Sequence, residues 1–179
     1  FNNYRTDILV NGSNRAIPTF FGTTPSWANL GRVRSKGYEI ALKIDHTFRN
    51  GFRLWADANM THAKEKILEQ DDAPLLPEYQ KGVNKQIGQA YSYIDHGHMN
   101  SWDELYASPV WNTNDSQKLP GDFMIVDYNG DGVINNDDNV PYGFSGNPQN
   151  TYSATIGFDW KGFSAFVQFY GVNNVTRQV

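Results

Sequence analysis

Residues 38–45 read Tyr-Glu-Ile-Ala-Leu-Lys-Ile-Asp, and this stretch decides the fold class. Apolar side chains occupy its even-numbered positions, Tyr38, Ile40, Leu42 and Ile44, whereas three of its four odd-numbered positions are charged. Successive side chains of an extended chain point to opposite faces, so a period of two separates an apolar face from a polar one. We therefore predict a β-strand that faces two different environments.

The same alternation returns along the rest of the chain. It covers residues 52–61, 152–160 and 163–170, and a shorter opening strand is expected over residues 4–10. Two connections are tight turns with the residues that hairpins favour, Arg49-Asn50-Gly51 and Lys161-Gly162. Strands joined by such turns run antiparallel, so the sequence predicts an all-β, antiparallel fold.

Long and short connections alternate along the chain. Residues 11–32 form a long connection, and residues 68–150 form a much longer one. In an up-and-down sheet this order places both tight turns at one end and both long loops at the other, which is the layout of outer-membrane barrels. Four aromatic residues gather at the tight-turn end, as an interfacial girdle would: Phe48, Phe52, Trp160 and Phe163.

A soluble antiparallel sandwich produces the same alternation and is the commoner structure. Three features favour a membrane barrel: charges on the polar face of every long strand, strict loop parity, and one connection of about 80 residues, far beyond the norm for a compact domain. Five strands cannot close a barrel. We therefore expect a fragment, in which residues 1–179 are an antiparallel sector of one large transmembrane β-barrel domain and residues 68–150 are a long acidic extracellular loop insert.

Charge is distributed unevenly over the 179 residues. Residues 69–138 contain 13 acidic residues and 3 lysines, a net charge of −10, whereas the rest of the chain is net +6. The overall charge of −4 argues against a nucleic-acid partner. Cysteine is absent, which excludes disulfide frameworks, thiolate zinc sites and cysteine nucleophiles. No apolar run reaches the roughly 18 residues that a membrane helix needs.

Several phrases of the sequence combine into a family resemblance. They are Asn-Leu-Gly-Arg-Val-Arg-Ser-Lys-Gly-Tyr-Glu-Ile at 29–40, Ile-Gly-Gln-Ala-Tyr-Ser-Tyr-Ile at 87–94, Pro-Gly-Asp at 120–122, Asp-Tyr-Asn-Gly-Asp-Gly-Val-Ile-Asn at 127–135, Tyr-Gly at 142–143 and Asn-Pro at 147–148. Their order resembles the C-terminal barrel region of SusC/RagA-type TonB-dependent outer-membrane transporters, from about residue 4 to about residue 171. Ala90 and the His96-Gly97-His98 run depart from the family pattern.

The resemblance implies nutrient import across the outer membrane of a Gram-negative bacterium, without enzymatic activity. Members of the family look like barrels of about 22 strands with a plug domain inside, embedded in outer-membrane lipid. They pair with a SusD-like surface lipoprotein that acts as a lid, and they import oligosaccharides or peptides through the TonB system. The alternative from another class is a soluble, secreted, calcium-stabilised β-domain that binds carbohydrate.

A twelve-residue segment from Asp127 to Asp138 matches a Ca²⁺-binding loop at positions 1, 3, 5, 6, 8 and 12. Gly132, at position 6, permits the sharp turn. The predicted ligands of one structural Ca²⁺ are the side chains of Asp127, Asn129, Asp131 and Asp138 and the carbonyl of Val133. The alternative is an acidic turn with no metal, because Asn-Gly and Asp-Gly steps also occur in ordinary turns.

Other residue types offer weaker candidates. His96 and His98 share one face of an extended segment and form a candidate metal pair, although a solvated loop is the preferred interpretation. The adjacent carboxylates Asp71-Asp72, Asp103-Glu104 and Asp137-Asp138 diverge and do not form a catalytic dyad. No nucleophile motif and no Gly-rich phosphate loop accompany them. The sequence therefore predicts a protein that is not an enzyme.

Exposed aromatic residues of the long connections are the last candidates. In a glycan importer they would stack on sugar faces, whereas in the simpler interpretation they pack the loop onto itself or onto the lid protein. The residues concerned are Trp27, Tyr79, Tyr91, Tyr93, Trp102, Tyr106 and Trp111. The sequence alone does not choose among them.

Overall fold

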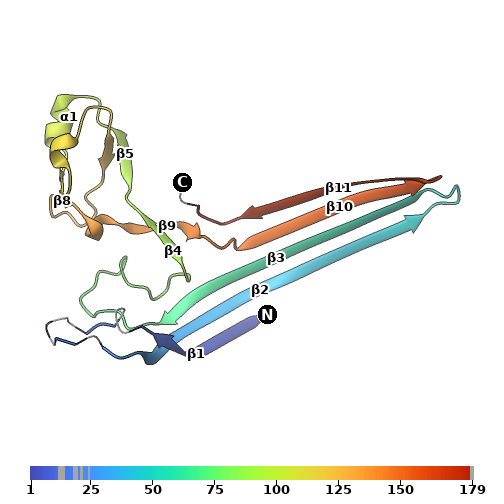
Figure 1. Ribbon diagram of the computed structural model, residues 1–179, viewed down its shortest axis with the longest axis horizontal. Helices are drawn as coiled ribbons and strands as arrows, with labels where there is room; N and C mark the ends of the chain where they lie inside the picture. Colours follow the sequence, from blue (N-terminus) through green and yellow to red (C-terminus); the bar gives the residue numbers. More distant parts are fainter. Residues whose placement is uncertain (12–14, 18–19, 21, 24, 178–179) are drawn as a thin grey trace. The chain divides into compact units, whose positions relative to one another are not determined.

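The structure is a computed structural model that describes residues 1–11, 15–17, 20, 22–23 and 25–177. The chain forms two compact units, each with its own architecture (Figure 1). Unit 1 comprises Phe1–Pro74, Gly82–Gln89 and Phe144–Val179, and unit 2 comprises Leu75–Lys81 and Ala90–Gly143. Unit 2 thus lies within the segment that the sequence predicts as an acidic insert.

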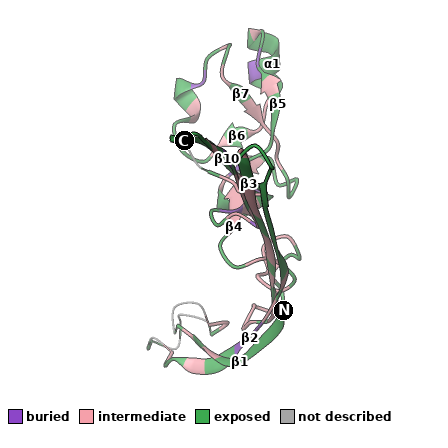
Figure 2. Cartoon of the chain, turned by 90° about the vertical axis from the view of Figure 1, so that its right-hand side faces the viewer, coloured by how far each residue is buried: buried purple, intermediate pink, exposed green. Residues whose placement is uncertain are grey.

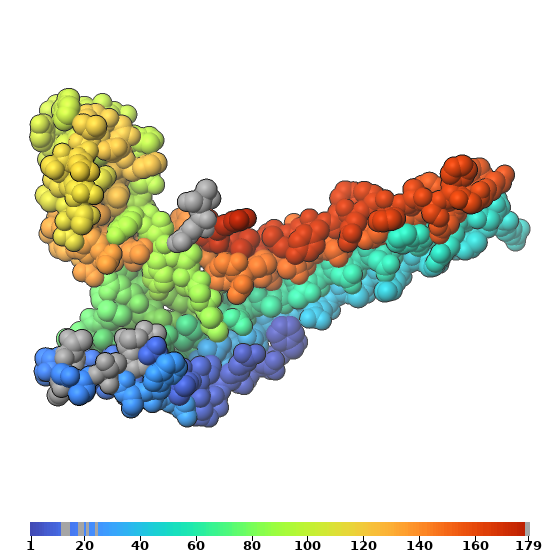
Figure 3. Space-filling view, viewed as in Figure 1, coloured from blue at the N-terminus to red at the C-terminus, as the bar shows by residue number. Residues whose placement is uncertain are grey.

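Unit 1 is a five-stranded antiparallel sheet. The strands are β1 (Asn2–Val10), β2 (Ala28–Thr47), β3 (Arg53–Glu69), β10 (Asn150–Trp160) and β11 (Phe163–Asn173), and their order in the sheet is β1-β2-β3-β10-β11. Every neighbouring pair is antiparallel. The strands β2, β3, β10 and β11 lie side by side, coloured from cyan to red in Figure 3. The predicted all-β, antiparallel fold is confirmed.

Two strands are longer than the alternation predicts. The predicted connection over residues 11–32 is wrong at its end, because β2 already begins at Ala28 and pairs there with Val10. This pairing is irregular: the register shifts between Arg5 and Leu9, and Asp7 has a φ of 56°. Such bulges break the period of two, so apolar and polar residues do not alternate at the ends of these strands.

Both predicted tight turns are present. Lys161 and Gly162 have φ values of 48° and 84°, so both residues of the loop between β10 and β11 are left-handed, as a type I′ hairpin requires. In the other turn, Gly51 has a φ of 78° and donates its backbone N–H to the carbonyl of Phe48 at 3.0 Å. These turns fix the register in which residues of β2, β3, β10 and β11 face one another.

The register gives the sheet one apolar and one polar face. On the apolar face, Ile40 pairs with Met60 and Met60 with Tyr152, while Ile156 pairs with Val167. These side chains are not covered by the chain: Ile40 is 56% exposed, and most of β2 is exposed, shown in green in Figure 2. Among the described apolar residues of unit 1, Val33 alone is buried. The sheet is therefore a single layer with a bare apolar face.

Unit 2 is built from short elements around a small core. Its elements include α1 (Trp102–Ala107), β5 (Asp95–His98) paired with β7 (Phe123–Ile125), β6 (Val110–Trp111) paired with β8 (Val133–Ile134), and the 3-10 turns Asp115–Gln117 and Asn136–Asp138; β4 (Gln89–Ser92) pairs with β9 (Val140–Ser145). Its buried apolar side chains are Met99, Leu105, Ile134 and Val140. No helix in the described part of the chain is long and apolar enough to cross a membrane.

Gly157 of β10 lies beneath the indole of Trp55, to which it is paired across the sheet. A Cβ at Gly157 would lie 2.3 Å from Cζ2 of Trp55 and 3.0 Å from the carbonyl oxygen of Ala165. We expect Gly157→Ala to lower the free energy of unfolding by about 1–3 kcal/mol through overpacking. The measurement is denaturant unfolding of the full-length protein. A smaller effect of the same change in a Trp55→Ala background is expected, and an equal effect in both backgrounds would contradict the proposed clash.

Candidate functional site

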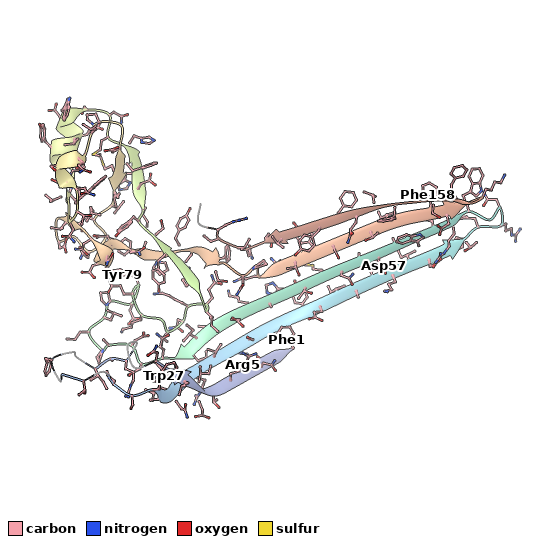
Figure 4. The ribbon with its side chains drawn as sticks, viewed as in Figure 1. Phe1, Arg5, Trp27, Asp57, Tyr79 and Phe158 are labelled. Carbon is pink, nitrogen blue, oxygen red and sulfur yellow. The ribbon has the colours of Figure 1, made fainter. Side chains whose placement is uncertain are left out.

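The polar face of the sheet carries ion pairs near the tight turns. The guanidinium of Arg53 forms ion pairs with Asp45 and with Asp159, the latter at 3.2 Å between Nη1 and Oδ2. Lys43 and Asp57 form a further pair at 3.4 Å between Nζ and Oδ1; Figure 4 labels Asp57 on β3. Exposed ion pairs contribute little to stability. Their consequence is a charged patch on the side of the sheet opposite the apolar face.

Aromatic rings cross the apolar face next to the tight turns. The ring of Phe52 lies 5.8 Å from that of Phe48 and 5.7 Å from that of Phe158, which Figure 4 labels. Trp160 and Phe163 pair directly across β10 and β11. The aromatic cluster predicted from the sequence is therefore present, and Phe158 extends it across the sheet.

A second group of rings lies toward the other end of the same face. Tyr38 stacks on His62 with 5.1 Å between ring centroids. The ring of Tyr152 lies against Gly171, where a Cβ would come within 2.2 Å of Cε2. Aliphatic pairs such as Ile156 and Val167 lie between the two aromatic groups. Two aromatic belts that flank an aliphatic band are typical of strands that cross a membrane.

The acidic loop over residues 127–138 is held by its own peptide groups. The carboxylate of Asp127 accepts backbone N–H groups from Gly130 at 2.7 Å, Asp131 at 3.2 Å and Gly132 at 2.6 Å. Gly130 and Gly132 have φ values of 76° and 84°, a conformation that glycine adopts without strain. The glycines thus let the chain wrap around the Asp127 carboxylate.

The next two predicted ligands continue this wrapping. Oδ1 of Asn129 accepts the backbone N–H of Asp131 at 3.0 Å, and Nδ2 of Asn129 donates to Oδ2 of Asp131 at 3.0 Å. Oδ1 of Asp131 accepts the N–H of Val133 at 2.8 Å. The carbonyl of Val133 accepts Nδ2 of Asn135 in a long contact of 3.4 Å.

Asp138 is the buried member of the set, with 1% of its surface exposed. Its two carboxylate oxygens accept the N–H groups of Tyr128 and Asn135, each at 2.8 Å. Asn135 and Asp138 also form a capping box on the 3-10 turn Asn136–Asp138. Sequence reasoning missed Asn135, although its place three residues before an acidic residue is the signature of a capping box.

The donor atoms of this loop suit Ca²⁺ in kind, because all are oxygens and the carboxylates stand at the expected positions. The structure nevertheless turns the carboxylates toward peptide N–H groups. Within the described ranges, no group of three or more His, Asp or Glu side chains is arranged to hold a metal ion. Ligation would require Asp127, Asp131 and Asp138 to turn toward a common point, so the Ca²⁺ site stays a prediction.

Tyr79 and Gln80 brace the acidic loop from a distant part of the sequence. The hydroxyl of Tyr79 donates to the carbonyl oxygen of Asp137 at 2.7 Å, and Nε2 of Gln80 donates to the same oxygen at 3.2 Å. The Tyr79 ring also packs edge-on against Tyr128 at 4.8 Å. Burial and the negative charge of Asp137 raise the pKa of Tyr79. The sequence separation of nearly 60 residues left no local signal for this contact.

The structure sorts the predicted loop aromatics into two groups. One group is partly buried, as expected if the rings pack the loop onto itself: Tyr79, Tyr91 and Trp111. The exposed group is Trp27, Tyr93, Trp102 and Tyr106. Trp102 and Tyr106 both belong to α1, with their ring centroids 6.2 Å apart.

Two of the remaining candidates, His98 and Asp72, have structural partners. Nδ1 of His98 lies 2.8 Å from the carbonyl oxygen of Gly121, and its ring packs 4.6 Å from that of Phe123. The carboxylate of Asp72 accepts the N–H groups of Gly82 and Val83 at 3.1 and 3.0 Å. These side chains stabilise local turns.

The chain is similar to solved structures of the RagAB peptide importer. The open-open state is 18% identical with a TM-score of 0.58, and the closed-closed state is 16% identical with a TM-score of 0.56; each match covers 97% of this chain. A further RagAB peptide transporter structure is 18% identical, with a TM-score of 0.53 over 94% of this chain. The chain spans 18% of the length of each solved chain.

At these identities the similarity shows the fold alone. No protein-family model matches the chain, and no curated protein matches it either. The structural neighbours are nevertheless transporter chains, and the match runs over both compact units of this chain.

Lys118 is a buried cation that fixes the middle of unit 2. Its side chain is 4% exposed, and Nζ lies 2.7 Å from Oδ1 of Asp115 and donates to the carbonyl oxygen of Pro109 at 3.0 Å. Asp115 also accepts the N–H of Trp111 at 2.8 Å. The hydrogen bond from Lys118, followed by that from Trp111, lowers the pKa of Asp115.

A lowered folded-state pKa means that Asp115 adds stability above its unfolded pKa of about 4, and that this stability is lost as the pH falls through the lowered value. We expect Asp115→Asn to weaken this acid-dependent loss and to lower the unfolding temperature at pH 7, because the Lys118 cation stays buried without its counter-ion. The measurement is the unfolding temperature of the full-length protein between pH 2 and pH 7. Asp103→Asn, at an exposed position, serves as the control and should leave the profile unchanged.

Proposed function

We propose that the chain is a barrel segment of a TonB-dependent outer-membrane nutrient transporter of the SusC type. The bare apolar face of the five-stranded sheet is the observation that supports this most directly. A water-soluble sheet buries such a face against a second layer, and unit 1 offers none among its described residues. Lipid is the environment that such a face fits, and the charged opposite face fits a hydrated lumen.

The dimensions of the strands support the same proposal. The 11 residues of β10 and the 11 residues of β11 match the roughly 9–11 residues of a tilted transmembrane strand. At a rise of about 3.3 Å per residue, the first and last Cα atoms of the 11-residue β10 are about 33 Å apart. At a tilt of roughly 40° this length spans about 25 Å, the height of the apolar band of outer-membrane barrels. β2 and β3 are longer and would extend beyond the bilayer on the long-loop side.

In this proposal unit 2 would lie on the extracellular side, because the alternation of long and short connections would make both tight turns periplasmic. There unit 2 would contact the substrate and a SusD-like lid lipoprotein, while import would be driven through the TonB system. The acidic side chains of the loop, such as Asp127 and Asp138, accept hydrogen bonds from backbone N–H groups. Such structural roles fit transport without enzymatic chemistry. Between the two predicted substrate classes, oligosaccharides and peptides, the similarity to a peptide importer favours peptides.

A charged residue introduced on the apolar face would distinguish this proposal from the alternative, a soluble calcium-stabilised carbohydrate-binding domain. Ile156 lies near the middle of β10 on the apolar face, and Thr155 is its neighbour on the polar face. We expect Ile156→Arg to destabilise a membrane-embedded sheet by about 2–4 kcal/mol and to deplete the protein from the outer-membrane fraction. Thr155→Arg should be tolerated. Equal tolerance of both changes would favour the soluble domain, in which a half-exposed Ile156 can be replaced freely.

We also propose that the loop over residues 127–138 binds one structural Ca²⁺ through Asp127, Asn129, Asp131, the Val133 carbonyl and Asp138. Unit 2 contains ten acidic residues and two lysines, and a divalent cation would offset their repulsion. A ligand that binds only the folded form stabilises it by mass action. The carboxylates would exchange part of their N–H hydrogen bonds for the metal.

The calcium proposal predicts that the full-length protein unfolds at a higher temperature with Ca²⁺ than with chelator. Asp131→Ala should remove this difference. Asp122→Ala is the matched control, because Asp122 also accepts a backbone N–H, from Leu119 at 2.8 Å, but lies outside the loop. An unfolding temperature that ignores the chelator in the unmodified protein would refute the site.

A further inference from the structure

The short helix α1 presents two large aromatic side chains that unit 2 does not cover. Leu105 is buried and anchors the helix in the core of unit 2. Trp102 and Tyr106, one turn apart, are 54% and 78% exposed, with a ring-centroid distance of 6.2 Å and an interplanar angle of 31°. Most of α1 is coloured as exposed in Figure 2. Two neighbouring rings of this size form an open contact surface rather than a packed interior.

Asp103 adds a carboxylate to the same face. It lies three residues before Tyr106, and residues with this spacing are neighbours on a helix surface. Glu104 on the same turn is occupied, because its Oε2 accepts the N–H of Asn100 at 2.7 Å. Asp103 is exposed, and its side chain makes no hydrogen bond or ion pair within the described part of the chain.

Unit 2 offers no spare cation to neutralise Asp103. Its two lysines are engaged elsewhere: Lys81 with Glu78 at the surface, and Lys118 with Asp115 in the interior. With ten acidic residues against these two lysines, unit 2 has a net charge of −8. Such a charge attracts cations toward the surface and repels anions.

We propose that Trp102, Asp103 and Tyr106 form a binding site for the lysine or arginine side chains of a peptide. Both rings attract a cation through their π-faces, and tryptophan does so best. The Asp103 carboxylate adds a charge-assisted hydrogen bond. A neutral sugar would also stack on the rings, but it would gain nothing from the surplus negative charge. That the bound peptide is cargo for import rests on the proposed function; the binding itself does not.

The test is calorimetric binding to the full-length protein in detergent. The probes are blocked trilysine, blocked triglutamate and maltotriose, each at low and high salt. We expect trilysine to bind in preference to the other two and to weaken with salt. Asp103→Asn and the double change Trp102→Ala, Tyr106→Ala should each weaken trilysine binding about three- to tenfold. Trp27→Ala, at a comparably exposed tryptophan of unit 1, should have no effect.

Three results would overturn the inference. The first is trilysine binding that all variants retain, and the second is a preference for maltotriose that the aromatic changes remove and Asp103→Asn does not. The third is that the α1 variants lose association with the lipoprotein but bind trilysine as the unmodified protein does. Uptake of labelled trilysine by cells, with and without TonB, separates this inference from the proposed function. Binding without TonB-dependent uptake would leave the site and remove the transporter role. TonB-dependent uptake that the α1 variants do not alter would leave the transporter role and remove the role of the α1 site in import.

Discussion

The uncovered apolar face of the sheet is the constraint on which the rest of unit 1 depends. The main chain of β10 is hydrogen-bonded to β3 on one side and to β11 on the other, so it leaves no unpaired polar main-chain groups in the middle of the sheet. What remains is a row of four or five apolar side chains on each long strand that need a nonpolar environment, such as Tyr38, Ile40, Leu42 and Ile44 on β2. Under the proposed function, the aromatic belts and the charged opposite face both follow from a sheet that separates water from a nonpolar phase.

Unit 2 differs from unit 1 in that its apolar core is small and its net negative charge is high. Its fold is stabilised by hydrogen bonds from backbone N–H groups to carboxylates, such as those of Asp127 and Asp138, rather than by extended secondary structure. Hydrogen bonds to charged groups are stronger than neutral ones. The same bonds place negative charges at fixed points, and they make the orientation of each carboxylate a property of the loop's backbone.

The sequence contained enough information to predict the sheet but not the interior of the insert. Period-two alternation at residues 38–45 and 152–160, and the Lys161-Gly162 turn, predicted strands, faces and antiparallel pairing because these depend on local geometry. The early start of β2 was missed because its register shifts between Arg32 and Val33 and again where it pairs with β1 near Asp7, which interrupts the period. Strands of two to six residues in unit 2 are too short to show any period.

For the candidate site, spacing located the Asp127–Asp138 loop, but spacing alone does not say which way a carboxylate points. That depends on partners such as Asn135, and on Tyr79 nearly 60 residues away. Composition likewise identified Trp102 and Tyr106 only as two of seven aromatic candidates. Their exposure depends on Leu105, whose burial fixes which side of a six-residue helix faces outward. A helix this short is not stable in isolation, so the aromatic and acidic face of α1 exists only while the core around Met99 and Leu105 is folded. Ligand binding and the folding of unit 2 are therefore thermodynamically linked: a ligand that binds the α1 face also stabilises the core beneath it.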